Sequence, residues 1–239
     1  EGWWNRGSET NFDGTPNTGF KTRVKGGYFP TAPYDKHGEV RDAMVENLQK
    51  VGFHIERFHH EVGAGQNEIN YRFNSMLHAG DDIQTFKYVV KQTAAQWGKT
   101  ATFMAKPIEG EPGSAMHIHH SVVEAETGRN IFSDEKGRET PAFLHFIAGM
   151  QRHLPAAVAL LAPYVNSYRR YVPDFAAPIN LEWGRDNRTT GLRVPISGPD
   201  ARRVENRLAG MDCNPYLGIA ASLATGYLGL VESDNPRAE

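Results

Sequence analysis

The chain contains 239 residues, of which 39% are hydrophobic and 23% charged, and its formal net charge is −2. This composition is typical of a folded protein of one or two domains and excludes a disordered, collagen-like or coiled-coil chain. The uncharged apolar run at residues 155–164 is far shorter than the roughly 20 residues that cross a bilayer, so we expect no membrane partner. The near-neutral charge argues against a nucleic-acid partner. A single cysteine and the lack of a signal-peptide pattern predict a cytoplasmic protein.

Two helices are predicted in the first hundred residues. Residues 1–37 are rich in glycine, asparagine, threonine and proline and are expected to form a loop that can include a hairpin. Apolar side chains then recur at helical spacing over residues 38–51, which predicts an amphipathic helix. A second helix is expected to begin at Asp81 or Asp82, either of which can cap it, and to end at Gly98.

The hydrophobic period drops to two in several segments, which predicts strands. Residues 53–61 and 66–73 are expected to pair through a tight turn at the glycine-rich residues 63–65. Two further strands are predicted at residues 100–106 and 115–124.

The second half of the chain begins with a predicted helix over residues 141–161, with a break or kink at Pro155. Residues 164–214 alternate strand-like pieces with proline and glycine turns, and a final helix is expected over residues 214–231. Because helices and hairpin-like strand pairs interleave, we expect an α+β fold in which a mixed or antiparallel sheet packs with helices on one side.

Acidic and histidine side chains gather next to the first predicted strand pair. Positions two apart on a strand share a face, so His59 and Glu61 are expected to point the same way. Glu61 and Glu68 lie on successive strands, and both carboxylates can reach one cavity. Two carboxylates and an imidazole suit Mg²⁺ or Mn²⁺ better than structural zinc, which favours thiolates.

A second histidine cluster lies at residues 117–120, where His117, His119 and Ser121 are expected to share one strand face. Taken singly, a packed or solvated histidine is the simpler interpretation, above all for His60 and His120.

Eight arginines and no lysine lie between residues 169 and 207. A guanidinium forks onto a carboxylate or phosphate with two parallel hydrogen bonds, so this bias predicts recognition of oxyanions. Residues 201–208 are predicted to form a strand whose one face carries Arg203, Glu205 and Arg207. By itself, a row of surface ion pairs explains this face more simply. Together with the acid and histidine cluster, we favour an anion-and-metal site.

A divalent metal combined with oxyanion-binding arginines is typical of phosphoryl transfer, in which the protein mainly positions groups and neutralises charge. The chain has no Walker-type phosphate loop, and residues 110–114 are too weak a match to be one.

Several ordered motifs resemble the glutamine synthetase superfamily over roughly residues 20–232. The resemblance implies that residues 1–239 form part of that family's catalytic domain, truncated at both ends and without the small N-terminal domain. It also implies self-association into rings, with a dodecamer expected. The motifs are His59-His60-Glu61, Gly65-Gln66-Asn67-Glu68, Thr102-Phe103-Met104-Ala105-Lys106-Pro107, Gly113-Ser114-Ala115-Met116-His117, Asn166-Ser167-Tyr168-Arg169-Arg170, Asn187-Arg188 with Arg193, and Ala201-Arg202-Arg203-Val204-Glu205-Asn206-Arg207.

The activity that the resemblance implies is ATP-dependent joining of the γ-carboxylate of glutamate to an amine through γ-glutamyl phosphate. Two or three Mg²⁺ or Mn²⁺ ions per site are expected, with ATP as co-substrate. The implied roles are metal ligation by Glu61, Glu68, His117 and Glu205, catalysis by Arg170, Arg188 and Arg193, substrate binding by Gly113, Arg170 and Arg207, and nucleotide binding by Glu56, Phe73, His119, Ser121, Arg193 and Arg203.

Two positions depart from glutamine synthetases proper. Ala176 stands where the family has a glutamate that closes the site and helps to bind and deprotonate ammonium, and Pro112 replaces an asparagine in the glutamate-binding loop. Both changes resemble the γ-glutamyl-polyamine and γ-glutamyl-monoamine ligase branch.

We therefore expect an alkyl amine or polyamine, such as putrescine, as the acceptor. The alternative is glutamine synthetase proper, which uses ammonium and in which Asp174 would replace the missing acid. A non-catalytic structural relative is a second alternative.

Overall fold

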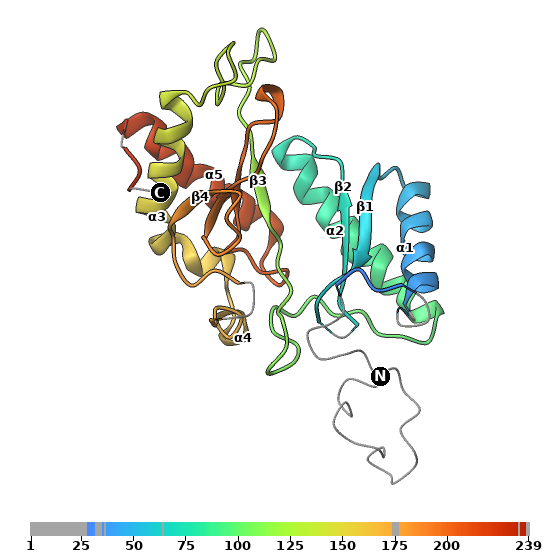
Figure 1. Ribbon diagram of the computed structural model, residues 1–239. Coiled ribbons are helices and arrows are strands. Elements are labelled where there is room, and N and C mark those ends of the chain that lie inside the picture. Colours follow the sequence, from blue (N-terminus) through green and yellow to red (C-terminus); the bar gives the residue numbers. More distant parts are fainter. Residues whose placement is uncertain are drawn as a thin grey trace. The chain divides into compact units, whose positions relative to one another are not determined.

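The computed structural model describes residues 28–31, 35, 37–63, 65–173, 177–233 and 235–237, so the predicted loop over residues 1–37 lies mostly outside it. The chain divides into two compact units (Figure 1). The first comprises Glu1–Phe103 and Ile108–Pro112, and the second comprises Met104–Pro107 and Gly113–Glu239. That both form part of one catalytic domain stays a prediction.

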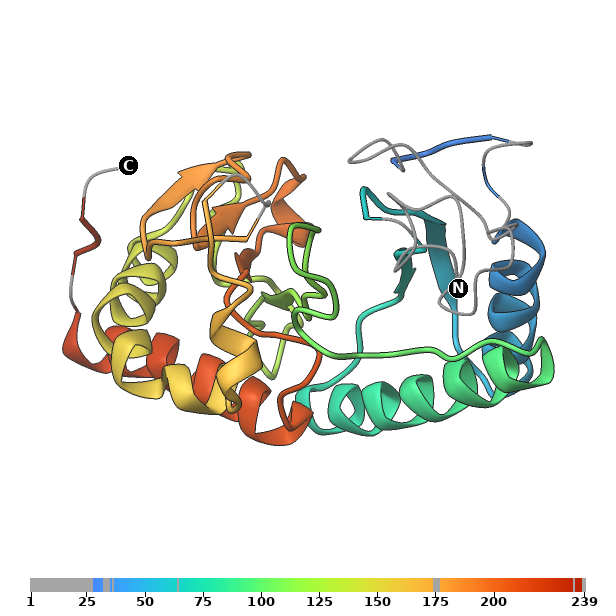
Figure 2. The ribbon, with the colours of Figure 1, turned by 90° about the horizontal axis from the view of Figure 1, so that it is seen from below.

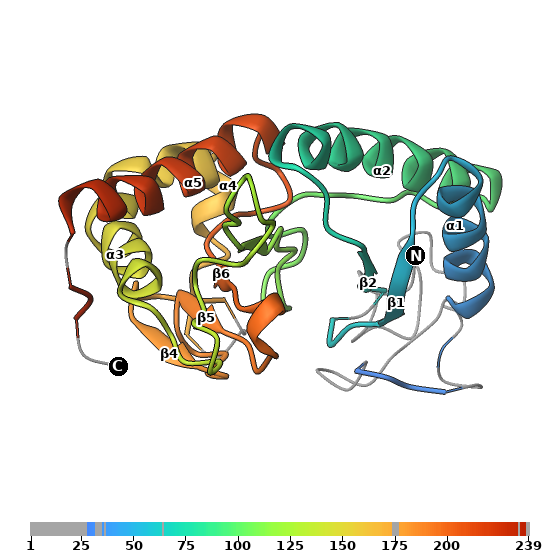
Figure 3. The ribbon, with the colours of Figure 1, turned by 90° about the horizontal axis from the view of Figure 1, so that it is seen from above.

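In the first unit two helices pack beside a hairpin. The helices α1 (Gly38–Lys50) and α2 (Met76–Gln96) contact each other, and α1 also contacts β1 (Ile55–His60) (Figure 3). Helix α1 confirms the helix predicted over residues 38–51. Strand β1 pairs antiparallel with β2 (Asn67–Tyr71), which confirms the predicted hairpin. The buried apolar side chains of the two helices are Val40, Val45, Leu48, Ile83, Val90 and Ala94.

The second helix begins earlier than the sequence indicates. Its N-cap residue is Ser75 and not Asp81 or Asp82, and the Asp82 carboxylate instead accepts a hydrogen bond from the side-chain amide of Asn74 at 3.0 Å. The apolar side chains of the first turn are exposed, so no buried stripe marks this start in the sequence. The predicted end, just before Gly98, is confirmed.

In the second unit a four-stranded mixed sheet packs with two long helices. The helices α3 (Pro141–Leu161) and α5 (Pro215–Glu232) contact each other extensively, and Figures 2 and 3 show both on one side of the sheet. Only β4 and β5 are parallel, so the predicted α+β fold with a mixed sheet is confirmed. The strand order is β3 (Ile118–His120), β6 (Val204–Asn206), β5 (Leu192–Val194) and β4 (Trp183–Arg185), and the short elements are α4 (Val165–Tyr168) and the 3₁₀ helix η1 (Pro199–Ala201).

Several predicted strands are shorter or absent. Residues 100–106 form no strand, and both backbone groups of Lys106 bond to the side-chain amide of Asn166 at 2.9 Å, outside any sheet. Of the strands predicted at residues 115–124 and 201–208, only the short segments β3 and β6 are present. The two segments pair with each other over only three residues, which limits their length.

Helix α3 continues through Pro155 to its end at Leu161, so the predicted break is wrong. The buried side chains of Phe146, Met150 and Leu154 hold this helix in the core even though proline donates no backbone hydrogen bond. No helix in the described part of the chain is long and apolar enough to cross a membrane.

The contact between α3 and α5 generates a stability prediction. A Cβ atom at Gly229 of α5 would collide with the carbonyl oxygen of His145 and lie 2.6 Å from the backbone nitrogen of Gly149. We predict that Gly229→Ala lowers the free energy of unfolding by about 1–3 kcal/mol, as overpacking does, measured by urea denaturation. Gly198→Ala is the matched control, since no atom lies within 4 Å of its Cβ position. Equal effects of the two substitutions would contradict the prediction.

Candidate active site

The hairpin of the first unit carries a compact group of metal-ligand side chains. The register of β1 and β2 places His59 opposite Glu68, and Glu61 follows His59 by two residues. One ligand atom from each of the three residues lies within 4.8 Å of the other two. The structure therefore brings the two carboxylates together, as the hairpin predicts. The ligand set implied by the family resemblance leaves out His59, although strand alternation places it beside Glu61.

The chemistry of this hairpin cluster fits a hard divalent cation. Burial raises the pKa of Glu68, and the charge of Glu61 raises it further, because two nearby carboxylates oppose each other's ionisation. The Glu61 carboxylate lies 3.1 Å from Nε2 of His59 and accepts the backbone N–H of Val62 at 2.9 Å. Mg²⁺ or Mn²⁺ bound between these oxygens would offset the repulsion. Ligation by Glu61 and Glu68 stays a prediction.

Two histidines adjacent to site residues are packed, which supports the simpler interpretation for both. His60 is 1% exposed, and its Nδ1 lies 2.7 Å from the carbonyl oxygen of Glu61. His120 is buried, and its Nε2 lies 2.7 Å from the hydroxyl of Ser222. Burial lowers the pKa of His120 to about 4, so its imidazole is neutral at pH 7.

In the second unit two arginines clamp a buried carboxylate. Glu205 on β6 is 2% exposed, and its two oxygens accept from Arg193 and Arg207, each at 2.8 Å. Burial opposes ionisation of Glu205, but the charges of His117, His119 and Arg207 outweigh it and lower the pKa to about 2. Glu205 is thus not part of a surface ion-pair row.

His117 is a chemically suitable metal ligand beside Glu205. Burial lowers the pKa of His117 to about 3 despite the charge of Glu205, and its Nδ1 has no hydrogen-bond partner within the described residues. Metals bind neutral imidazole, and a carboxylate has lone pairs beyond those used by its two ion pairs. Glu61 and Glu68 belong to the first unit and His117 and Glu205 to the second, so one shared ion cluster stays a prediction.

Two predicted substrate-binding residues pack together. Arg170 is 2% exposed, and its guanidinium donates to the backbone carbonyls of Arg207, at 3.2 Å, and Leu208. A Cβ at Gly113 would lie 2.6 Å from Cγ of Arg170 and would collide with the carbonyl oxygen of Ala105. Only glycine fits at this position.

The residues predicted to bind nucleotide are divided between the units. Glu56 and Phe73 belong to the first unit, and Phe73 is 85% exposed. Phe73 lines a cavity of about 250 Å³ together with Tyr71, Arg72 and other residues around the end of β2.

In the second unit, Nε of Arg203 donates to Nδ1 of His119 at 3.2 Å, so these two predicted nucleotide-binding residues lie together. His119 stands opposite Glu205 in the β3–β6 pair. Ser121 and Arg188 are exposed, Ser121 just after β3 and Arg188 between β4 and β5.

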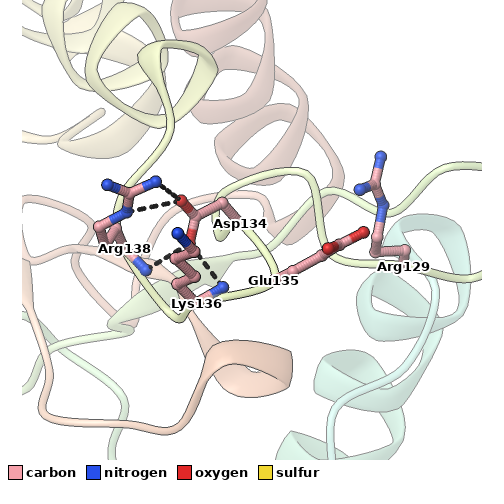
Figure 4. Close-up of a pocket in the computed structure, with 5 residues that line it drawn as sticks. All are labelled: Arg129, Asp134, Glu135, Lys136 and Arg138. Atoms are coloured by element: carbon pink, nitrogen blue, oxygen red, sulfur yellow. Dashed lines mark hydrogen bonds and ion pairs between the residues drawn. The ribbon is translucent and has the colours of Figure 1, made fainter.

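A separate open pocket of about 270 Å³ lies on the loop before α3 (Figure 4). Within this loop the Asp134 carboxylate pairs with the Arg138 guanidinium at 2.8 Å. None of the predicted site residues lines it; its lining residues are Arg129, Asp134, Glu135, Lys136 and Arg138.

Of the two departures from the family pattern, only one falls in the described part of the chain. Pro112 is half-buried at the end of the first unit, whereas Ala176 and the neighbouring Asp174 lie outside the described residues.

Comparison with known proteins identifies the class. The family model described as "Glutamine synthetase, catalytic domain" matches residues 4–239. The chain is 48% identical over 98% of its length to glutamine synthetase of Mycolicibacterium smegmatis. The corresponding identities are 45% for glutamine synthetase of Streptomyces coelicolor, over 98% of this chain, and 41% for that of Nostoc sp., over 99%. The chain spans about half the length of these curated relatives, with 50% of each covered.

The chain belongs to the glutamine synthetase family. The superfamily assigned from the motifs is confirmed, whereas the γ-glutamyl-polyamine branch is not shown by these comparisons.

Buried His120 generates a pH prediction. Its folded-state pKa of about 4 lies below the ordinary 6.5, so unfolding takes up a proton between these values. The stability that this neutral histidine confers is complete above pH 6.5 and is lost as the pH falls towards 4. We predict that in His120→Gln the free energy of unfolding falls less between pH 6.5 and pH 4 than it does in the wild type. The measurement is urea denaturation at several pH values. The exposed His54→Gln is the control and is expected to retain the wild-type slope.

Proposed function

We propose that this chain supplies part of the catalytic domain of an ATP-dependent ligase that joins the γ-carboxylate of glutamate to ammonium. The observation that carries the proposal is the hairpin cluster, in which Glu61 and Glu68 are held together although their charges repel. A non-catalytic relative would have no need to hold like charges in place, so this cluster favours an enzyme.

The chemistry proceeds in two steps. The γ-carboxylate oxygen of glutamate attacks the γ-phosphorus of ATP and releases ADP. Ammonium then loses a proton, and the nitrogen of the resulting ammonia attacks the acyl carbon of γ-glutamyl phosphate, releasing phosphate and a second proton as the amide forms. Bound Mg²⁺ or Mn²⁺ would neutralise oxyanion charge during both steps. We assign its ligation to Glu61, Glu68, His117 and Glu205.

The arginines of the second unit are suited to the anionic groups of these substrates. Arg193 and Arg207 both pair with Glu205, and Arg193 also pairs with Asp186 at 2.6 Å. We assign Arg193, Arg207 and the exposed Arg188 to contacts with phosphate. The Arg170 guanidinium donates to the neutral backbone carbonyls of Arg207 and Leu208, and we assign its charge to the α-carboxylate of glutamate. Gly113 lies against it and is assigned to the amino group of glutamate. Nucleotide binding is assigned to Glu56, Phe73, His119, Ser121, Arg193 and Arg203.

Ammonium is favoured as the acceptor because the relatives at 41–48% identity are named glutamine synthetases. A larger alkyl amine is the second candidate, since Ala176 provides no carboxylate for ammonium and Pro112 removes a side-chain amide. We further propose self-association into rings, with a dodecamer expected, and a cytoplasmic location. Ring assembly rests on the family resemblance, and the location rests on the single cysteine.

The choice of acceptor can be tested directly. In the full-length protein, phosphate release from ATP and glutamate is measured with ammonium and with a panel of monoamines and diamines that includes putrescine. We predict a higher kcat/KM for ammonium than for any amine.

The control is Glu68→Gln, which is expected to abolish turnover with every acceptor. A higher kcat/KM for one of the amines would establish the second candidate instead. Undiminished turnover by Glu68→Gln would refute the proposed metal site.

A further inference from the structure

A buried arginine of α1 connects the start of that helix to the turn of the hairpin cluster. Arg41 is 8% exposed, and its guanidinium donates to Oδ1 of Asn67 at 2.8 Å and to the carboxylate of Asp35 at 2.5 Å. The side-chain amide of Asn67 in turn donates to the carbonyl oxygen of Gly65 at 3.1 Å. One continuous series of hydrogen bonds therefore links Asp35, Arg41, Asn67 and Gly65.

Asn67 and its partner on β1 are direct chain neighbours of the two carboxylates. Asn67 precedes Glu68 and pairs with His60 in the β1–β2 ladder. His60 precedes Glu61, and its Nδ1 lies 2.7 Å from the Glu61 carbonyl oxygen. Since side chains alternate along a strand, these neighbours face away from the hairpin cluster while the carboxylates face into it.

The two carboxylates need such support because they repel each other. A flexible turn would let Glu61 and Glu68 move apart, and a cation would then have to bring them together at a cost in binding free energy. The short turn between the strands is itself closed by Gln66, whose backbone carbonyl accepts the Glu61 N–H at 2.8 Å and whose side-chain oxygen accepts the Gly63 N–H at 3.1 Å. Arg41 fixes the other side of the turn.

We propose that Arg41 is a positioning residue for cation binding, which holds Asn67 and thereby orients Glu68 towards Glu61 and His59. This inference rests on the proposed cation site. Arginine suits the task because its planar fork reaches Asp35 and Asn67 at the same time. A lysine ammonium keeps the charge but lacks the fork, so it can pair with Asp35 without holding Asn67.

The test is Mn²⁺ binding by the full-length protein, measured from the electron paramagnetic resonance signal of free Mn²⁺. We expect Arg41→Lys to weaken Mn²⁺ binding by about 10-fold or more, as substitutions behind metal ligands do. The matched control is Arg57→Lys, at an exposed arginine on β1 whose side chain makes no hydrogen bond within the described residues, and it is expected to leave the affinity unchanged. Unchanged affinity in Arg41→Lys would overturn the inference. If Arg41→Lys does not fold, Asn67→Ala replaces it, because this variant leaves the Arg41 pair with Asp35 in place.

A double-mutant comparison separates positioning from a general loss of stability. In a Glu68→Gln background, Arg41→Lys is expected to have no further effect on Mn²⁺ binding, because the ligand that it positions is gone. The same fold-loss in both backgrounds would show a merely structural contribution and overturn the inference. If Glu68→Gln alone leaves Mn²⁺ affinity unchanged, the proposed cation site fails and the inference with it. If Glu68→Gln weakens binding and Arg41→Lys does not, only the positioning role fails.

Discussion

The antiparallel register of β1 and β2 is the constraint on which the hairpin cluster depends. It sets His59 opposite Glu68 and leaves Glu61 on the same face, one strand repeat further along. A slip of one residue would turn Glu68 to the opposite face and bring Asn67 in its place, which would exchange a charged ligand for a neutral amide. The cluster is therefore a property of strand pairing as much as of residue type.

Strand register also determines which side chains meet in the second unit, where three strands are involved. His119 on β3 and Arg193 on β5 both stand opposite Glu205 on the central strand β6. Arg207 lies two residues further along the same chain and bonds to the same carboxylate. The buried carboxylate of Glu205 thus receives hydrogen bonds from the guanidiniums of Arg193 and Arg207, and these charges help to keep it ionised.

Local periodicity was sufficient to predict the elements whose pattern reflects burial. The helix over residues 38–51 and the final helix each have a buried stripe, and both are present. The hairpin is also present, although its strands have no continuous buried face. The strand predicted at residues 100–106 failed because alternation also occurs in an extended segment that has no strand partner. The pairing of Glu205 with Arg193 could not be read from the sequence, since it depends on which strands become neighbours in the sheet.

In both units, polar side chains of the helices form hydrogen bonds with the chain neighbours of the candidate site residues. In the first unit Arg41 of α1 bonds to Asn67, the neighbour of Glu68. In the second unit, the Ser222 hydroxyl of α5 lies 2.7 Å from Nε2 of His120 and accepts a hydrogen bond from the side-chain amide of Asn206 at 2.8 Å. His120 follows His119 in the chain, and Asn206 follows Glu205. Alternation dictates this arrangement, because the residue next to an outward-facing site residue must point towards the helix layer. In the second unit these neighbours, His120 and Asn206, are buried, and a buried polar group costs stability unless it is paired. The Ser222 hydroxyl on α5 is therefore the partner that the buried faces of β3 and β6 require.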